Sequence, residues 1–109
     1  MNLDDLTIGQ LKEIGKLIGT KSDDSAWEIG EIYLIRTVTM IDTGKLVKVT
    51  EHELVLEDAA WIVDTGRFAD AVRKAEFDEV EPFPDGKVIL GRGAIVDSVK
   101  IKTSPRSQK

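Results

Sequence analysis

Apolar residues recur at helical spacing near the start of the chain. Over residues 7–18 they lie three or four positions apart, which predicts a short amphipathic helix. Thr7 and Gln10 have the spacing of a capping box, and Gly19 suits the left-handed position just after a helix. The apolar face of this expected helix consists of Leu11, Ile14, Leu17 and Ile18. Residues 19–29 are polar and rich in turn-forming types, so we expect a linker there.

The spacing then changes to the alternation that is typical of strands. Residues 31–40 are rich in β-branched types, residues 45–50 alternate between apolar and polar, and residues 53–63 form a third strand-like run. The first two runs are separated by Asp-Thr-Gly at residues 42–44, which we interpret as a hairpin turn. Residues 51–52 form a second, minimal turn. These features predict an antiparallel meander of three strands.

After the third strand the apolar residues return to helical spacing. A short helix is expected with one apolar face, made of Phe68, Ala71, Val72 and Ala75. Asp64 or Thr65 is the expected cap of this helix. The remaining segments are expected to be a rigid loop (81–86), a short strand (87–90), a tight turn (91–93), a last strand (94–101) and a flexible tail (103–109).

The order of these elements predicts a mainly β fold with short helices. Five short strands in a small domain suggest a partly open barrel of the Sm-like or SH3-like type, which we place at residues 30–102. The N-terminal helix precedes this barrel, and the second helix is inserted after the third strand. Residues 1–102 would then form a single globular domain. Because the last strand is an expected edge, we predict that it pairs with a neighbouring subunit in a homo-oligomer.

Composition and charge narrow the possible functions. The 109 residues carry a formal net charge of −5, which argues against binding a long nucleic acid through bulk electrostatics. The chain has no cysteine and a single histidine, His52, so we expect neither a metal site nor a cofactor. No apolar run is long enough to span a membrane, and the acidic N-terminus lacks an apolar signal core. We therefore expect a cytoplasmic protein.

Asp-Thr-Gly is also the signature of aspartic proteases, and it occurs twice here. The copy at residues 64–66 follows a hydrophobic pair, and residues 88–93 resemble the later hydrophobic-Gly-Arg element of the retroviral enzymes. Three features oppose this alternative. The spacing between the two elements is too short for the flap of such an enzyme, a bulky Arg67 follows the glycine, and the second copy at residues 42–44 suggests that the tripeptide arises as a turn. We favour a non-catalytic protein.

An anion site fits the stretch around Gly66 better. A helix N-terminus has free N–H groups, Gly66 lets a ligand approach the backbone, and Arg67 adds a forked donor that suits phosphate. The simpler alternative is a capped turn in which Arg67 pairs with Asp64 or Asp70.

Three further residues could contribute to such a site. Arg92 lies in a Gly-Arg-Gly turn, Arg36 interrupts an apolar run, and Trp61 could stack on a base. Each has a structural alternative, namely a solvated turn residue, an ion pair within the sheet and a core residue. The candidate ligand-binding residues are therefore Arg36, Trp61, Asp64, Thr65, Gly66, Arg67 and Arg92.

Residues 7–62 resemble small accessory proteins of bacteriophages. The resemblance rests on the opening helix, the Ile-Gly-Glu-Ile-Tyr-Leu-Ile-Arg-Thr stretch at residues 29–37, the glycine-containing hairpin and the Ala-Ala-Trp-Ile stretch at residues 59–62. It implies a protein acting in the bacterial cytoplasm and no catalytic activity. By analogy with phage proteins that sequester nucleotide signals of bacterial immunity, we expect a small anionic, nucleotide-type ligand. An Sm-like RNA-binding or assembly ring is the alternative.

Overall fold

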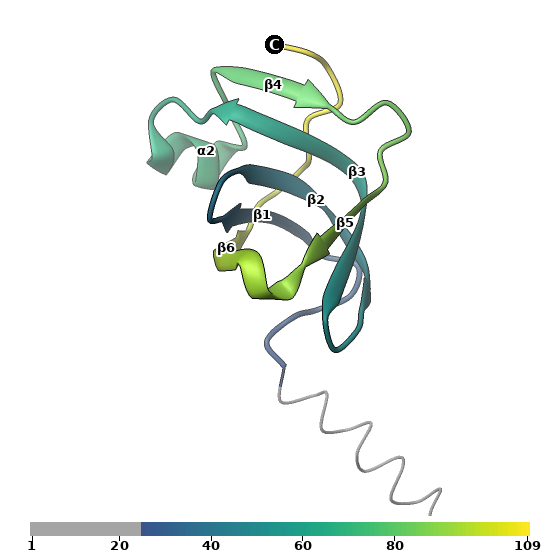
Figure 1. Cartoon of the computed structure of the whole chain (residues 1–109). Helices are drawn as coiled ribbons and strands as arrows, with labels where there is room; N and C mark the ends of the chain where they lie inside the picture. The colour runs from purple at the N-terminus through teal and green to yellow at the C-terminus, as the bar shows by residue number, and fades with distance from the viewer. Residues whose placement is uncertain (1–24) are drawn as a thin grey trace, which may run out of the picture.

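The computed structural model describes residues 25–109, and this part of the chain is mainly β (Figure 1). Six antiparallel strands form one sheet, one more than the five that the sequence predicts. The α-helix inserted after the third strand agrees with the prediction. The elements are β1 (Ile32–Thr37), β2 (Ile41–Val49), β3 (Glu53–Asp64), α2 (Phe68–Lys74), β4 (Glu79–Pro82), β5 (Val88–Gly91), the 3-10 helix η2 (Arg92–Ala94) and β6 (Ile95–Lys100). The expected helix at residues 7–18 lies outside the described residues. Among residues 25–109, no helix has the length and apolar character needed to span a membrane.

The long strand β3 organises the sheet. The strand order is β4-β3-β2-β1-β6, and β5 also pairs with β3. The first half of β3 pairs with β5 and its second half with β4, so that two short strands share one edge of a twelve-residue strand. Between these halves Asp58 has a positive φ of 54°, which bends β3. The sheet curls around this bend but is not closed.

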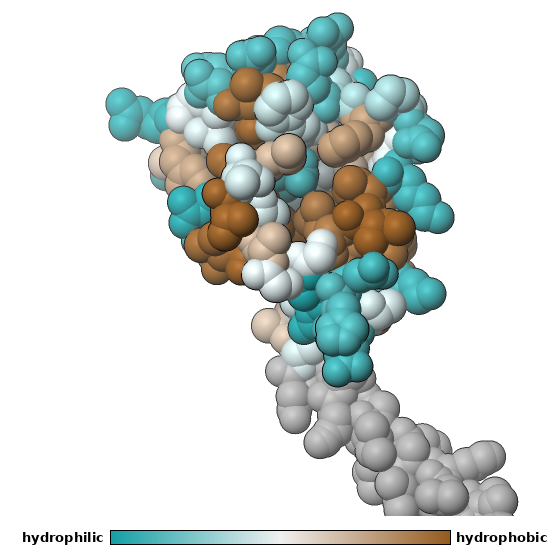
Figure 2. Space-filling view, in the orientation of Figure 1, coloured by the Kyte–Doolittle hydropathy of each residue, from teal (hydrophilic) through white to brown (hydrophobic). Residues whose placement is uncertain are grey.

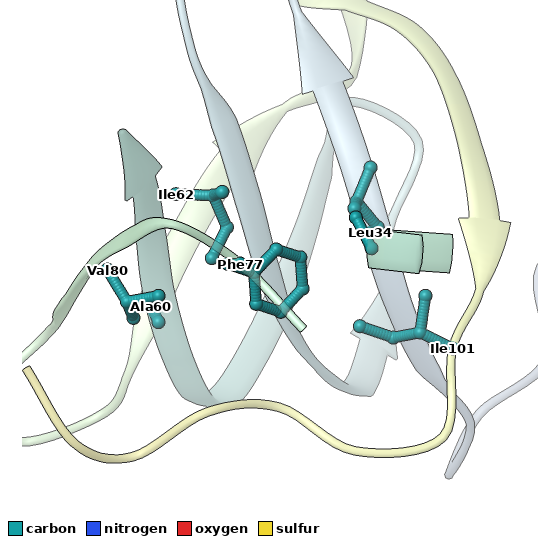
Figure 3. Packing of buried hydrophobic residues seen from close by; sticks show 7 residues of the cluster. Leu34, Ala60, Ile62, Phe77, Val80 and Ile101 are labelled. Atoms are coloured by element: carbon teal, nitrogen blue, oxygen red, sulfur yellow. The ribbon is translucent and has the colours of Figure 1, made fainter. Parts of the chain in front are cut away.

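Both faces of the sheet bury apolar side chains. On one face the residues shown in Figure 3 converge from β1, β3, β4, the segment before β4 and the segment after β6: Leu34, Ala60, Ile62, Phe77, Val80 and Ile101. Helix α2 adds Ala71 to this cluster. The other face carries a second cluster, made of Tyr33, Ile35, Leu46, Leu54, Leu56 and Ala59. A sheet of this size is stabilised because both faces are covered.

The first hairpin turn lies at residues 38–40, so the prediction of a turn at residues 42–44 is wrong. The Thr37 hydroxyl accepts hydrogen bonds from the backbone N–H groups of Met40 (3.0 Å) and Thr39 (3.4 Å). This side-chain turn reverses the chain without glycine. Gly44 lies within β2 instead, where an added Cβ would lie 2.9 Å from the Leu56 Cβ atom. The glycine therefore serves the close approach of β2 and β3.

The segments after α2 also differ from the prediction. Residues 79–82 form the strand β4, although no strand was expected there and residues 81–82 were expected to belong to a loop. Residues 103–109, expected to be a flexible tail, lie against the sheet. Ser104 is buried and shares a hydrogen bond of 2.9 Å with the Thr43 hydroxyl. The backbone of Lys109 exchanges two hydrogen bonds of 2.9 Å with Val80, because the edge of β4 offers unpaired backbone groups.

Candidate functional site

The turn between β3 and α2 is closed by its own side chains. The Gly66 N–H group donates to Asp64 Oδ1 (2.9 Å), and the Thr65 hydroxyl donates to the Gly66 carbonyl (2.9 Å). Gly66 has a positive φ of 69°, and a Cβ added there would lie 2.6 Å from Asp78 Oδ1. The space beside Gly66 is thus occupied by a carboxylate. Within this turn, the glycine N–H group expected to face a ligand is already bonded.

Helix α2 begins at Phe68, three residues after Thr65 and four residues after Asp64, which were the two expected caps. Arg67 occupies the N-cap position with extended φ and ψ angles, and no side chain caps the helix, so the prediction of an Asp64 or Thr65 cap is wrong. Asp64 stabilises the preceding turn instead. The Arg67 side chain is exposed, and it makes no hydrogen bond or ion pair with another residue of the described segment.

Arg36 lies next to the start of α2. Its guanidinium carbon is 5.7 Å from the centre of the Phe68 ring, and its Nε atom donates to Asp97 Oδ1 (2.7 Å). A second hydrogen bond from Arg36 reaches Asp97 Oδ2, which makes the pair bidentate. These hydrogen bonds lower the pKa of Asp97. Arg36 therefore forms the ion pair within the sheet that was the structural alternative for this residue, and its partner lies on the neighbouring strand β6.

Arg92 braces the second hairpin from η2. Its Nη1 atom donates to the Thr50 carbonyl (2.6 Å), and its backbone N–H group donates to the His52 carbonyl (2.8 Å). Arg92 follows Gly91, which pairs with the first residue of β3, whereas Arg67 comes after the last residue of that strand. The two arginines thus lie at opposite ends of β3. The structure does not bring them into one site.

The aspartates of the two Asp-Thr-Gly copies lie in different environments. Asp42 lies within β2, is 3% exposed, and its Oδ1 atom has no hydrogen-bond partner among the described residues. Burial raises the pKa of Asp42 to about 6. Asp64 is exposed at the end of β3 and is engaged by the Gly66 N–H group. In the part of the chain that the structure describes, no group of three or more acidic or histidine side chains could hold a metal ion.

Trp61 lines a shallow groove on the surface of β3 and β4. Its side chain is 39% exposed, so the interpretation as a core residue does not hold. We call this feature the Trp61 groove, and its lining consists of Trp61, Val63, Glu79, Glu81, Pro82, Phe83 and Pro84. Trp61 is directly opposite Glu81 in the register of β3 and β4. Paired residues point to the same face of a sheet, so the indole and the carboxylate lie side by side.

The segment after β6 positions the far wall of the groove. Arg106 donates to the carbonyl groups of Ala59 (2.7 Å) and Phe83 (3.2 Å). The Phe83 N–H group also donates to the Ala59 carbonyl (3.0 Å), which fixes the end of β4 against the bend of β3. Gln108 Nε2 contacts both carboxylate oxygens of Glu81 at 3.3 and 3.2 Å. The groove is therefore preformed by contacts between segments that are distant in sequence.

Of the seven predicted site residues, the structure groups some and separates others. Residues 64–67 share one turn, and Arg36 lies beside this turn because its guanidinium group contacts the ring of Phe68. Trp61 lies in the groove of β3 and β4, and Arg92 lies at the second hairpin. Trp61 is the one groove residue among the seven predicted from the sequence. One signal could have revealed β4, because residues 79–81 alternate acidic, apolar and acidic types, and Val80 is buried. Comparison of the sequence with models of protein families and with curated proteins finds no match.

Proposed function

We propose that this chain is a non-catalytic binding protein whose Trp61 groove captures a short peptide segment of another protein. The observation that carries this proposal is the 39% exposed indole of Trp61, which lies directly opposite Glu81. Large aromatic side chains in preformed, partly apolar depressions are typical anchors of protein interfaces. A neighbouring carboxylate adds selectivity for charge.

The chemistry of the groove favours a partner with both apolar and positively charged side chains. Val63, the two prolines and Phe83 offer apolar surface to a leucine or a proline. A lysine or an arginine can lie on the face of the indole within ~6 Å while it pairs with Glu79 or Glu81. The net charge of −5 favours the approach of a basic partner at long range.

A partly open barrel of the SH3-like type is the framework that we propose for this groove. Its support is the strand order β6-β1-β2-β3-β5, in which β3 bends at Asp58 and a 3-10 helix links β5 to β6. In such a framework the segment of α2 and β4 is an insertion between the third strand and β5. The Trp61 groove lies between the second half of β3 and that insertion, so an added function can reside there while the remaining strands stabilise the domain.

Isothermal titration calorimetry with two matched peptides tests the proposal. The probe is an acetylated, amidated Pro-Leu-Pro-Arg-Lys-Pro peptide, and its control has glutamates in place of the two basic residues. We expect the basic peptide to bind and the acidic peptide to fail. Trp61→Ala should weaken binding at least about tenfold, because it removes the aromatic anchor. Combined Glu79→Gln and Glu81→Gln should weaken it about two- to tenfold and reduce its salt dependence.

Ile89→Ala provides the matched surface control. Ile89 is 58% exposed on β5 and is not part of the groove, so its truncation should leave the affinity unchanged. The proposal fails if the basic peptide does not bind to the wild-type chain. It also fails if Trp61→Ala binds this peptide as tightly as the wild-type chain does.

A second candidate function is the capture of a small anionic ligand at Arg67. The observation that favours it is the exposed Arg67 side chain, which has no partner in the described segment and lies next to the exposed ring of Phe68. A nucleotide could place a phosphate on Arg67 and its base on Phe68, beside Arg36. The carboxylates of Asp64 and Asp78 near the turn oppose this candidate, which is why we rank it second. With such a site, the protein would sequester a nucleotide signal of the bacterium.

Thermal-shift titration with a panel of cyclic and linear nucleotides tests this candidate. Arg67→Ala should weaken a bound nucleotide about ten- to a hundredfold, and Arg67→Lys should restore little. Arg73→Ala, in the last turn of α2, is the matched control because it removes the same charge from the other end of the helix. The candidate is refuted if no nucleotide shifts the melting temperature, or if Arg67→Ala and Arg73→Ala have equal effects.

A further inference from the structure

Strand β6 forms an open end of the sheet. It is the last strand in the order β4-β3-β2-β1-β6, and among residues 25–109 it pairs with β1 alone. The opposite end of the sheet is different, since the backbone of Lys109 exchanges two hydrogen bonds with Val80 at the edge of β4. An uncovered edge presents unpaired N–H and C=O groups, which are a template for another strand.

Exposed apolar side chains lie next to this edge. Val96 on β6 is 59% exposed, and Val38 and Met40 in the neighbouring hairpin are 71% and 47% exposed. All three line one shallow depression, which also includes Arg36. Figure 2 shows apolar atoms gathered where Figure 1 draws β6 and the turn between β1 and β2. Contiguous apolar surface of this kind typically marks an interface.

The charged residues of β6 do not protect its edge. Native edge strands often carry unpaired charged side chains. Such charges oppose pairing with a second strand, because they would repel like charges on it or lose their hydration. Here Asp97 is paired with Arg36, and Lys100 donates to Glu28, so both charges are neutralised within the same chain. Two chains that each carry a charge of −5 can therefore meet at this edge without local repulsion.

We propose that β6 is a self-association surface, on which the β6 strand of a second copy pairs antiparallel with the first. A two-fold axis perpendicular to the sheet relates the two strands, so each edge supplies the same donors and acceptors to the other. Val96, Val38 and Met40 of the two copies bury one another beside the new strand pair. The Trp61 groove is lined by β3, β4 and the loop that follows, so pairing through β6 leaves its lining residues outside the strand contact.

Sedimentation equilibrium of the full chain from about 1 to about 200 μM tests this proposal. We expect a concentration-dependent dimer with twice the 12.1 kDa mass of the chain. Val96→Lys places a charge on the edge and should return the protein to a monomer over the same range. Ile89→Lys places the same charge on an equally exposed residue of β5 and should leave the dimer intact. Far-UV circular dichroism confirms that both variants fold.

Hydrogen exchange gives a second readout that does not depend on a variant. Amides of residues 95–100 should exchange more slowly as the protein concentration rises, whereas those of β4 should not change. A monomer at every concentration overturns the proposal. A dimer that persists in Val96→Lys, or protection that appears at β4 and not at β6, overturns it as well, because the second copy then occupies another surface.

Discussion

Replacing Asp42 by asparagine should change how the stability of the fold depends on pH. Asp42 is 3% exposed in β2, and its Oδ1 atom has no hydrogen-bond partner among the described residues. Burial raises its pKa to about 6 from the ordinary value of 3.8. The folded state therefore binds this proton more tightly than the unfolded state does. Protonation of Asp42 therefore favours the folded state. This contribution to the free energy of unfolding is fully present below about pH 4 and is lost as the pH rises through 6.

The size of the effect follows from the two pKa values. Their difference corresponds to about 3 kcal/mol of unfolding free energy at neutral pH. An asparagine side chain cannot ionise, so the variant avoids this loss, although the amide has a constant cost of about 1–3 kcal/mol if it is left unpaired. The difference in stability between Asp42→Asn and the wild-type chain should therefore rise by about 2 kcal/mol between about pH 4 and about pH 7, because a part of the full effect is already lost at pH 4.

Urea unfolding monitored by far-UV circular dichroism measures this difference. Both proteins are unfolded at a series of values from about pH 4 to about pH 8, and the two free energies are subtracted at each pH. The remaining carboxylates titrate in both proteins, so their contributions cancel. A difference that is flat across this range would refute the reasoning, because it would mean that Asp42 keeps its ordinary pKa in the folded state.

Three substitutions test individual contacts by thermal or urea unfolding. Gly44→Ala should destabilise the fold by about 1–3 kcal/mol, because its Cβ would meet Leu56 at 2.9 Å; a melting temperature equal to that of the wild-type chain would contradict this. Arg92→Ala should cost about 1–3 kcal/mol through the lost hydrogen bond to the Thr50 carbonyl, without affecting any nucleotide affinity; unchanged stability would reassign Arg92 to a solvated turn. Gly66→Ala should destabilise by about 1 kcal/mol or more, since its φ is 69°, and an unaltered urea midpoint would show that the turn can relax.

Local sequence patterns predicted the strands in which apolar and polar residues alternate clearly. The long third strand, the minimal turn after β2 and the inserted helix follow from apolar spacing within a few residues, which is the scale at which such patterns act. The first hairpin could not be located in this way. Its turn consists of β-branched and apolar residues and depends on the Thr37 hydroxyl, whereas the glycine-containing tripeptide at residues 42–44 lies within a strand.

The candidate site depended on contacts that no local pattern contains. Trp61 lies on an alternating strand, but whether its face is open is decided by the fold of β4 and by Arg106, which contacts Phe83 and Ala59 from the end of the chain. Arg92 was a reasonable ligand candidate as an arginine in a glycine turn, yet its partner Thr50 is 42 residues away. Charged residues in turns can serve a ligand or the fold, and only the tertiary structure distinguishes the two.

The two tryptophans of the chain allow one direct test of the Trp61 groove. In a nuclear magnetic resonance titration with the basic hexapeptide, the indole N–H signals of Trp61 and Trp27 can be followed separately. Trp27 packs edge-on against Tyr33, with ring centres 5.1 Å apart, and is not part of the groove, so it is the internal control. We expect the signals of Trp61 and of residues 79–83 to shift with the peptide while the Trp27 signal stays in place. Saturating shifts that leave Trp61 unmoved would contradict it.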